Sequence, residues 1–76
     1  MKIEELESEF ILELVKANVI PVMDHNIIYL ADSKYNRQIS SAIIQKLGLD
    51  MNDELYRFIE GFICIHFSKK GVRIAV

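Results

Sequence analysis

The sequence is short of cysteine and proline, with one of each in 76 residues, and it has no long apolar run. A lone cysteine cannot form an internal disulfide, which favours a reducing compartment such as the cytoplasm. No segment approaches the roughly 20 apolar residues of a membrane-spanning helix, and the acidic, amphipathic start MKIEELESEF lacks the apolar core of a signal peptide. We therefore expect residues 1–76 to fold as a single cytoplasmic domain that does not enter a membrane.

Basic charge is also scarce, because nine Lys and Arg residues are outnumbered by eleven Asp and Glu residues, for a net charge of -2. Nucleic-acid binding depends on a basic surface, so a general affinity for nucleic acid is not expected. Apolar residues, by contrast, make up 51% of the chain. A domain this small is mostly surface, so we expect some of its apolar side chains to face a partner protein.

Apolar residues at helical spacing predict three helices, over residues 2–18, 33–47 and 53–60. Asp32 or Ser33 should cap the second helix, and the glycine that follows it should end it. The side chains expected to face the core are Ile3, Leu6, Phe10, Leu14 and Ala17 in the first helix and Tyr35, Ile39, Ala42, Ile43 and Leu47 in the second.

A first β-hairpin is predicted around the polar residues Asp24–Asn26, taken as a three-residue loop. This loop sets Val22 opposite Ile28. Ile20 then lies opposite Leu30 on the same face, because strand side chains alternate with a period of two.

The end of the chain predicts a second hairpin, with apolar strands on both sides of the four-residue loop Ser68–Gly71. That loop sets Phe67 opposite Val72. Ile65 then faces Ile74 on the same side of the sheet. The expected order is therefore α-β-β-α-α-β-β, a small α+β domain with an antiparallel sheet packed by helices.

Basic residues at the start of the second helix form one candidate site. Ser33, Lys34 and Arg37 lie where free backbone amides can hold a phosphate or a carboxylate. Cations in a first turn oppose the helix dipole, which calls for an explanation. An anion site is one explanation, and simple pairing of the cations with Asp32 is the other.

Cys64 and His66 are two residues apart on an expected strand, so they share one face. A nearby imidazole can lower the pKa of a thiol and make it a nucleophile. We favour a buried, inert Cys64, since neither a third orienting group nor an oxyanion site is evident. A metal-ligand set and a phosphate-binding loop are also missing, so the sequence predicts neither an enzyme nor a cofactor.

The final hairpin carries a small basic tip of Lys69, Lys70 and Arg73, which on an edge strand often serves only to discourage strand addition. The segment IIQKLGLDMNDELYRF resembles a helix-turn-helix, and together with this hairpin it resembles a winged helix. The resemblance implies a reader helix over 53–60 and a wing over 62–76. That reader helix would be mainly acidic, which favours contact with protein over contact with DNA.

The sequence thus predicts a non-catalytic protein–protein interaction module, an accessory subunit or an inhibitor of a partner protein, with a winged-helix DNA-binding regulator as the alternative. The strand over 62–67 has apolar residues on both faces, so it should be central and covered on both sides. Three short helices are too few to cover both faces, which favours a two-fold homodimer. The expected contact residues are Phe10, Ile11, Leu12, Val15, Ile74, Ala75 and Val76.

Overall fold

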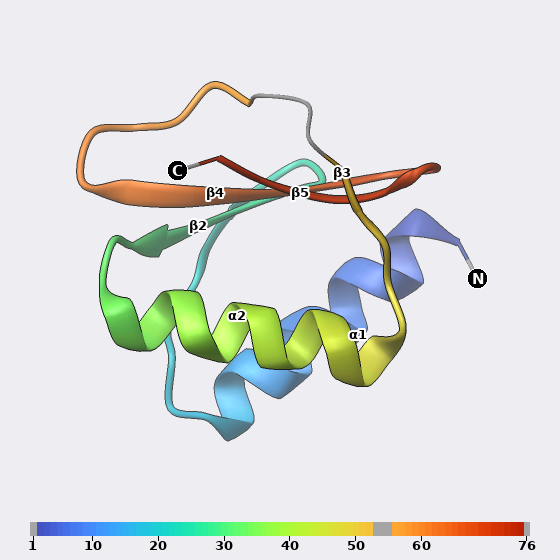
Figure 1. Cartoon of the computed structure of the whole chain (residues 1–76), viewed down its shortest axis with the longest axis horizontal. Coiled ribbons are helices and arrows are strands. Elements are labelled where there is room, and N and C mark those ends of the chain that lie inside the picture. The colour runs from blue at the N-terminus through green and yellow to red at the C-terminus, as the bar shows by residue number, and fades with distance from the viewer. Residues whose placement is uncertain (1, 53–55, 76) are drawn as a thin grey trace.

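The computed structural model describes residues 2–52 and 56–75. Its elements are α1 (Ile3–Lys16), β1 (Val22–Asp24), β2 (Ile27–Ala31), α2 (Lys34–Leu47), β3 (Met51–Asn52), β4 (Phe62–Ser68) and β5 (Gly71–Ala75). The strands form one sheet in the order β1-β2-β4-β5-β3. Both helices lie on the same face of that sheet (Figure 1). The predicted α+β class, with a sheet packed by helices, is confirmed.

The core lies between the helices and the central strand β4. Ile63, Ile65 and Phe67 of β4 are buried and point toward the helices. Phe10 and Leu14 of α1 pack against them, and the Phe10 and Phe67 rings meet edge-on with their centroids 5.3 Å apart. The predicted apolar stripe of α1 and the central place of this strand are therefore both confirmed.

Helix α2 begins and ends as its sequence predicts. The Ser33 hydroxyl oxygen accepts a hydrogen bond from the Asn36 amide at 3.1 Å, which makes Ser33 the N-cap. Gly48 ends the helix in the left-handed conformation, at a φ of 67°. The Leu49 amide then donates to the Ile44 carbonyl at 3.1 Å, the backbone bond typical of a glycine-terminated helix.

The buried face of α2 matches the predicted one only in part. Ile43 is buried as expected, and Ile39 and Leu47 pack partly buried against the core. Ile44 and Ser40, which the predicted stripe left out, are also buried. Tyr35 and Ala42, which the predicted stripe included, are exposed. Ser40 tolerates burial because its hydroxyl donates to a backbone carbonyl one turn earlier, at 2.8 Å. An apolar pattern cannot reveal a core position that a serine fills.

The final hairpin has the predicted register, with Phe67 paired to Val72 and Ile65 to Ile74. Its loop is tighter than predicted, because Ser68 and Gly71 also pair and leave a two-residue turn. The sheet is therefore continuous almost to the hairpin tip.

The predicted register of the first hairpin is wrong by one residue. Val22 pairs with Tyr29 instead of Ile28, and a two-residue turn of His25 and Asn26 joins β1 to β2. Both turn residues have positive φ, 38° and 30°. Such a turn matches the right-handed twist of paired strands, and this match outweighs the apolar alignment that a three-residue loop would give.

The predicted third helix is also wrong where the structure describes it. Residues 56–60 contain no helix, and residues 53–55 lie outside the described part. The chain instead adds β3, which runs parallel to β5 at the edge of the sheet. A reader helix is therefore absent over residues 56–60, and the winged-helix resemblance loses the element on which it depended.

Gly71 allows the chain before β3 to come close to β5. The Val72 amide donates to the Asp50 carbonyl at 2.8 Å. A Cβ on Gly71 would lie 2.5 Å from the same carbonyl oxygen, and φ at this glycine is 134°. Both the close approach and the backbone conformation need a residue without a side chain.

Candidate protein-binding surface

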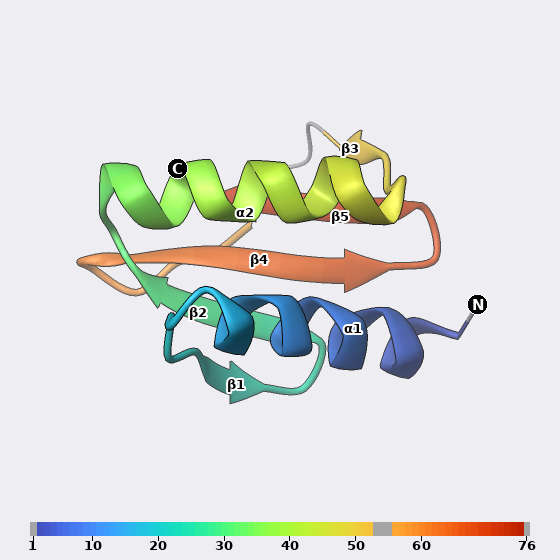
Figure 2. The ribbon, with the colours of Figure 1, turned by 90° about the horizontal axis from the view of Figure 1, so that it is seen from below.

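One edge of the sheet gathers exposed apolar side chains from α1, from the connection to β1 and from β1 itself. Their exposed fractions run from 48% for Leu12 to 90% for Ile20. Together Leu12, Val15, Ile20, Val22 and Met23 are called the edge patch below. Strand β1 is the outermost strand on this side, so the patch follows an edge of the sheet (Figure 2).

Local structure at the end of α1 forces this exposure. Asn18 takes a φ of 60°, which turns the chain out of the helix. The Val19 amide donates to a carbonyl of α1 at 2.9 Å, and the Val19 side chain is buried. Ile20, the next residue in an extended chain, therefore points into solvent. Val15, Ile20 and Pro21 line one shallow cavity of about 410 Å³, which shows that the helix and the connection share a single surface.

The patch is electrically neutral. The chain from Ala17 to Met23 has no charged residue, and the nearest charges along the chain are Lys16 and Asp24.

The first half of α1 is acidic and lies near the first hairpin. Burial and the neighbouring Glu4 raise the pKa of Glu7, while His25 lowers it by a smaller amount. That interaction places the tip of the first hairpin near the acidic half of α1.

The predicted contact residues are divided between the interior and the surface. Leu12 and Val15 are exposed and belong to the edge patch. Phe10 and Ala75 are buried within the fold, so neither can reach a partner. Ile11 and Ile74 are partly buried against the core. The last predicted residue, Val76, lies outside the described part of the chain.

Sequence reasoning missed Ile20, Val22 and Met23 as surface residues. In the predicted register of the first hairpin, Val22 and Ile20 lay opposite Ile28 and Leu30, which the structure shows to be buried. The one-residue change of register reverses that assignment, because neighbouring residues of a strand point to opposite faces. The turn residues His25 and Asn26 carried the missing signal, since a two-residue turn needs positive φ and Asn adopts it readily.

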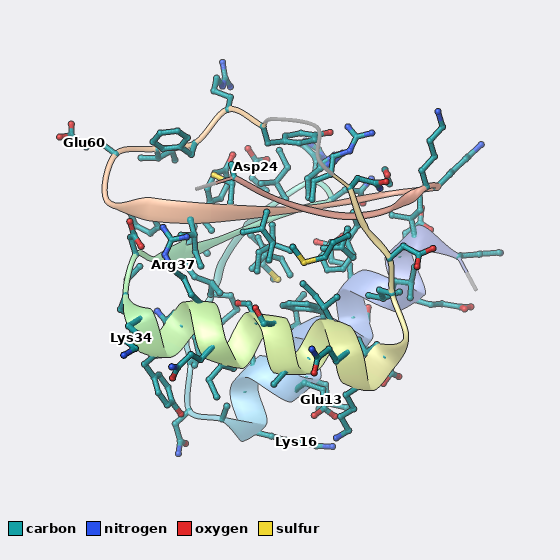
Figure 3. The ribbon with its side chains drawn as sticks, in the orientation of Figure 1. Glu13, Lys16, Asp24, Lys34, Arg37 and Glu60 are labelled. Carbon is teal, nitrogen blue, oxygen red and sulfur yellow. The ribbon has the colours of Figure 1, made fainter. Side chains whose placement is uncertain are left out.

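The cations at the start of α2 are arranged for pairing within the chain. The Nε atom of Arg37 donates to Asp32 Oδ1 at 2.8 Å, and its Nη2 lies 2.7 Å from the same oxygen. Lys34 lies at the same end of α2 but extends away from the sheet, whereas Arg37 reaches toward it (Figure 3). Pairing with Asp32 therefore explains the position of Arg37. Lys34 and Arg37 extend in different directions, so they do not converge with Ser33 on a single site.

The predicted basic tip is also divided. Lys69 and Lys70 are exposed in the two-residue turn between β4 and β5. Arg73 lies within β5 instead, where its guanidinium carbon is 5.4 Å from the centroid of the Tyr56 ring. Arg73 thus belongs to the face of the sheet opposite the helices, away from the two lysines.

On that opposite face, Tyr56 covers a polar cluster. Its ring stacks on His66 with the centroids 3.9 Å apart, and its hydroxyl oxygen lies 3.0 Å from His66 Nε2. Burial lowers the pKa of His66, and the positive charge of Arg73 lowers it further. Among the described residues, neither His66 Nδ1 nor Asn52 Nδ2, both buried, has a hydrogen-bond partner.

The predicted burial of Cys64 beside this cluster is confirmed. Cys64 lies on the same strand and is fully buried, so its thiol does not meet solvent. In residues 2–52 and 56–75, no three His, Cys, Asp or Glu side chains gather where a metal ion could be held. The imidazole has a tyrosine above it and a cation beside it, an arrangement that holds the Tyr56 segment against the sheet.

Neither helix of the described chain has the length and apolar character needed to cross a membrane. Comparison with protein-family models, with curated proteins and with solved structures found no match in any of the three.

Proposed function

We propose that this chain is a non-catalytic protein–protein interaction module, an accessory subunit or an inhibitor that acts by covering a partner's surface. The edge patch carries the proposal. Single exposed apolar residues are common on protein surfaces, but five of them gathered along one sheet edge favour a contact surface.

The edge itself supports the same function. Proteins commonly protect edge strands by short length, proline, lysines or inward charges. Strand β1 is three residues long, with Asp24 at its turn end and Pro21 just before its start, but neither residue covers the apolar side chains between them. Val22 and Met23 between them are each more than half exposed. A partner that covered this edge would bury apolar surface that now faces water, and each such side chain would add favourable free energy.

We further propose that the module acts in the cytoplasm. Cys64 is a free thiol, and a reducing compartment keeps such a thiol free without further protection.

The test uses the chain immobilised on a resin and exposed to an extract of its native host. Ile20→Glu places a charge in the centre of the edge patch and should abolish retention of the bound protein, whether another protein or the chain's own copies. Met51→Glu is the matched control, because Met51 is a half-exposed apolar residue on β3, at the opposite edge of the sheet. Equal retention by the wild type and by Ile20→Glu would contradict the proposed function.

A further inference from the structure

The backbone of β1 can accept only one kind of neighbour. In a two-residue hairpin, the residues that flank the turn exchange hydrogen bonds and the next pair does not. Asp24 flanks the turn and pairs with Ile27, so Asp24 directs its peptide groups toward β2. Met23 is the next residue and directs its N–H and C=O away from the sheet. Strand β1 therefore offers one free donor and one free acceptor, both on Met23.

The neighbours of Met23 limit the register further. Two residues before it, the outward position is Pro21, which has no N–H to donate. Two residues after it, the outward position is His25, which lies in the turn at a φ of 38°. An added strand can thus form its ladder only around Met23.

We propose that the partner at this edge is a second copy of the chain, joined by antiparallel pairing of β1 with β1 about a two-fold axis at Met23. This inference rests on the proposed function and names its partner. The two Met23 residues would exchange N–H···O=C bonds, the arrangement in which one residue supplies both bonds of a symmetric pair. The sheets of the two protomers would become one continuous sheet.

The side chains fit this arrangement. Met23 pairs with the buried Ile28 and so lies on the helix-covered face of the sheet. Helix α1 is the helix nearer this edge, and α2 lies toward the opposite edge (Figure 2). Pairing about Met23 brings the two Met23 side chains together beneath the exposed Leu12 and Val15 of both α1 helices. The contact would bury apolar surface of Leu12, Val15 and Met23 on the helix-covered face, while Val22, which pairs with Tyr29, lies on the other face.

The charges of α1 favour a second copy in this orientation. A two-fold axis perpendicular to the sheet at β1 also sets the two α1 helices antiparallel, with their second halves beside the axis (Figure 2). The first half of α1 is acidic, with Glu4, Glu5, Glu7 and Glu9, whereas Glu13 and Lys16 of the second half pair with each other at 3.4 Å. The charge-paired halves then meet at the axis and the acidic halves point away from each other, which avoids the repulsion of a parallel arrangement.

The size of the patch sets the expected strength. Stable complexes bury roughly 1,200 to 2,000 Å² in total, and weaker, reversible ones bury less. A few half-exposed apolar side chains per copy with a short ladder make a small interface. The dimer should therefore form at micromolar concentration and dissociate on dilution.

Sedimentation equilibrium of the whole purified chain tests the inference, with Met23→Lys and Met51→Lys as a matched pair. Both methionines lie on edge strands and have similar exposure, 53% and 57%, but on opposite edges of the sheet. The wild type and Met51→Lys should show twice the 8.8 kDa chain mass, and Met23→Lys should show 8.8 kDa. A monomeric wild type at high concentration, or equal association of the two variants, would overturn the inference.

A second pair of variants gives a geometric readout that does not depend on a destabilising charge. Residues that face each other in a hydrogen-bonded antiparallel pair have Cβ atoms about 5.5 Å apart, which is too far for an unstrained disulfide but within reach of a short bismaleimide. Met23→Cys should therefore form a covalent dimer with that crosslinker, and Met51→Cys should not. Equal crosslinking of both would overturn the proposed register. A monomeric wild type whose retention of host protein is still abolished by Ile20→Glu would sink the second-copy inference and leave the proposed function standing.

Discussion

The two faces of the sheet are covered by different kinds of residues. On one face, two amphipathic helices cover apolar side chains of the central strands, and the Phe10–Phe67 contact lies at the centre. On the other face, the segment after β3 crosses the sheet without helical structure over residues 56–60 (Figure 1). Its Tyr56 covers His66 and Arg73, and two buried polar atoms there lack hydrogen-bond partners among the described residues.

The contrast predicts which face of the sheet stabilises the fold and which face responds to pH. Apolar burial is non-directional, so the helix-covered face gains free energy from every side chain that it buries. On the opposite face, an unpaired buried polar group costs about 1–3 kcal/mol, which offsets part of what the covering tyrosine contributes. The helix-covered face should therefore carry most of the stability, and the opposite face should respond more to pH.

The largest expected loss of stability comes from a substitution in the core of the helix-covered face. Phe67→Ala removes a fully buried ring and leaves a cavity beside Phe10, so it should lower the free energy of unfolding by about 3–5 kcal/mol. Phe58→Ala is the matched control, because Phe58 is half exposed in the segment after β3 and should cost less than about 1 kcal/mol. Urea unfolding monitored by circular dichroism measures both. Similar losses for the two variants would contradict the division between the faces.

A smaller effect is expected where β5 meets the chain that leads to β3. Gly71→Ala adds a Cβ 2.5 Å from the Asp50 carbonyl oxygen at a φ of 134°, so it should displace β3 and cost about 1–3 kcal/mol. Gly61→Ala separates the two causes, because Gly61 also has positive φ but no atom lies within 4 Å of its added Cβ. If close contact matters, Gly71→Ala should be the more destabilising variant in the same urea experiment. An equal loss would leave only the backbone conformation as the cause.

The sequence predicted the helix-covered face well, because local signals and burial agree there. The stripe of α1, the ends of α2 and the register of the final hairpin all follow from periodicity, capping and turn residues. In each case the residues that favour the local structure are also those that the core needs.

The opposite face and the β1 edge were not predictable by the same means. Residues 53–60 combine acidic residues and helical spacing, yet residues 56–60 form no helix. Their contacts with β4 and β5, such as Tyr56 with His66, come from residues distant in sequence, and no local pattern encodes them. The edge patch was missed for another reason, since a single residue of turn length decides which side chains β1 exposes.

The smallest expected effect comes from His66 on the less apolar face. Burial and Arg73 lower the pKa of His66 below its ordinary value of 6.5, so the unfolded chain binds a proton more readily than the folded chain. Stability should then rise with pH through the region just below 6.5 and fall on acidification, because protonation favours the unfolded state.

The variant His66→Gln removes this titration and tests the prediction. Comparison of urea midpoints at about pH 8 and about pH 5.5, on either side of the ordinary histidine pKa of about 6.5, should show a smaller acid-induced loss for His66→Gln than for the wild type. Tyr56→Phe keeps the stacked ring but removes the hydroxyl near Nε2, so most of the acid-induced loss should persist in it. An acid-induced loss of the same size in His66→Gln and in the wild type would assign the pH dependence to the carboxylates of the chain instead.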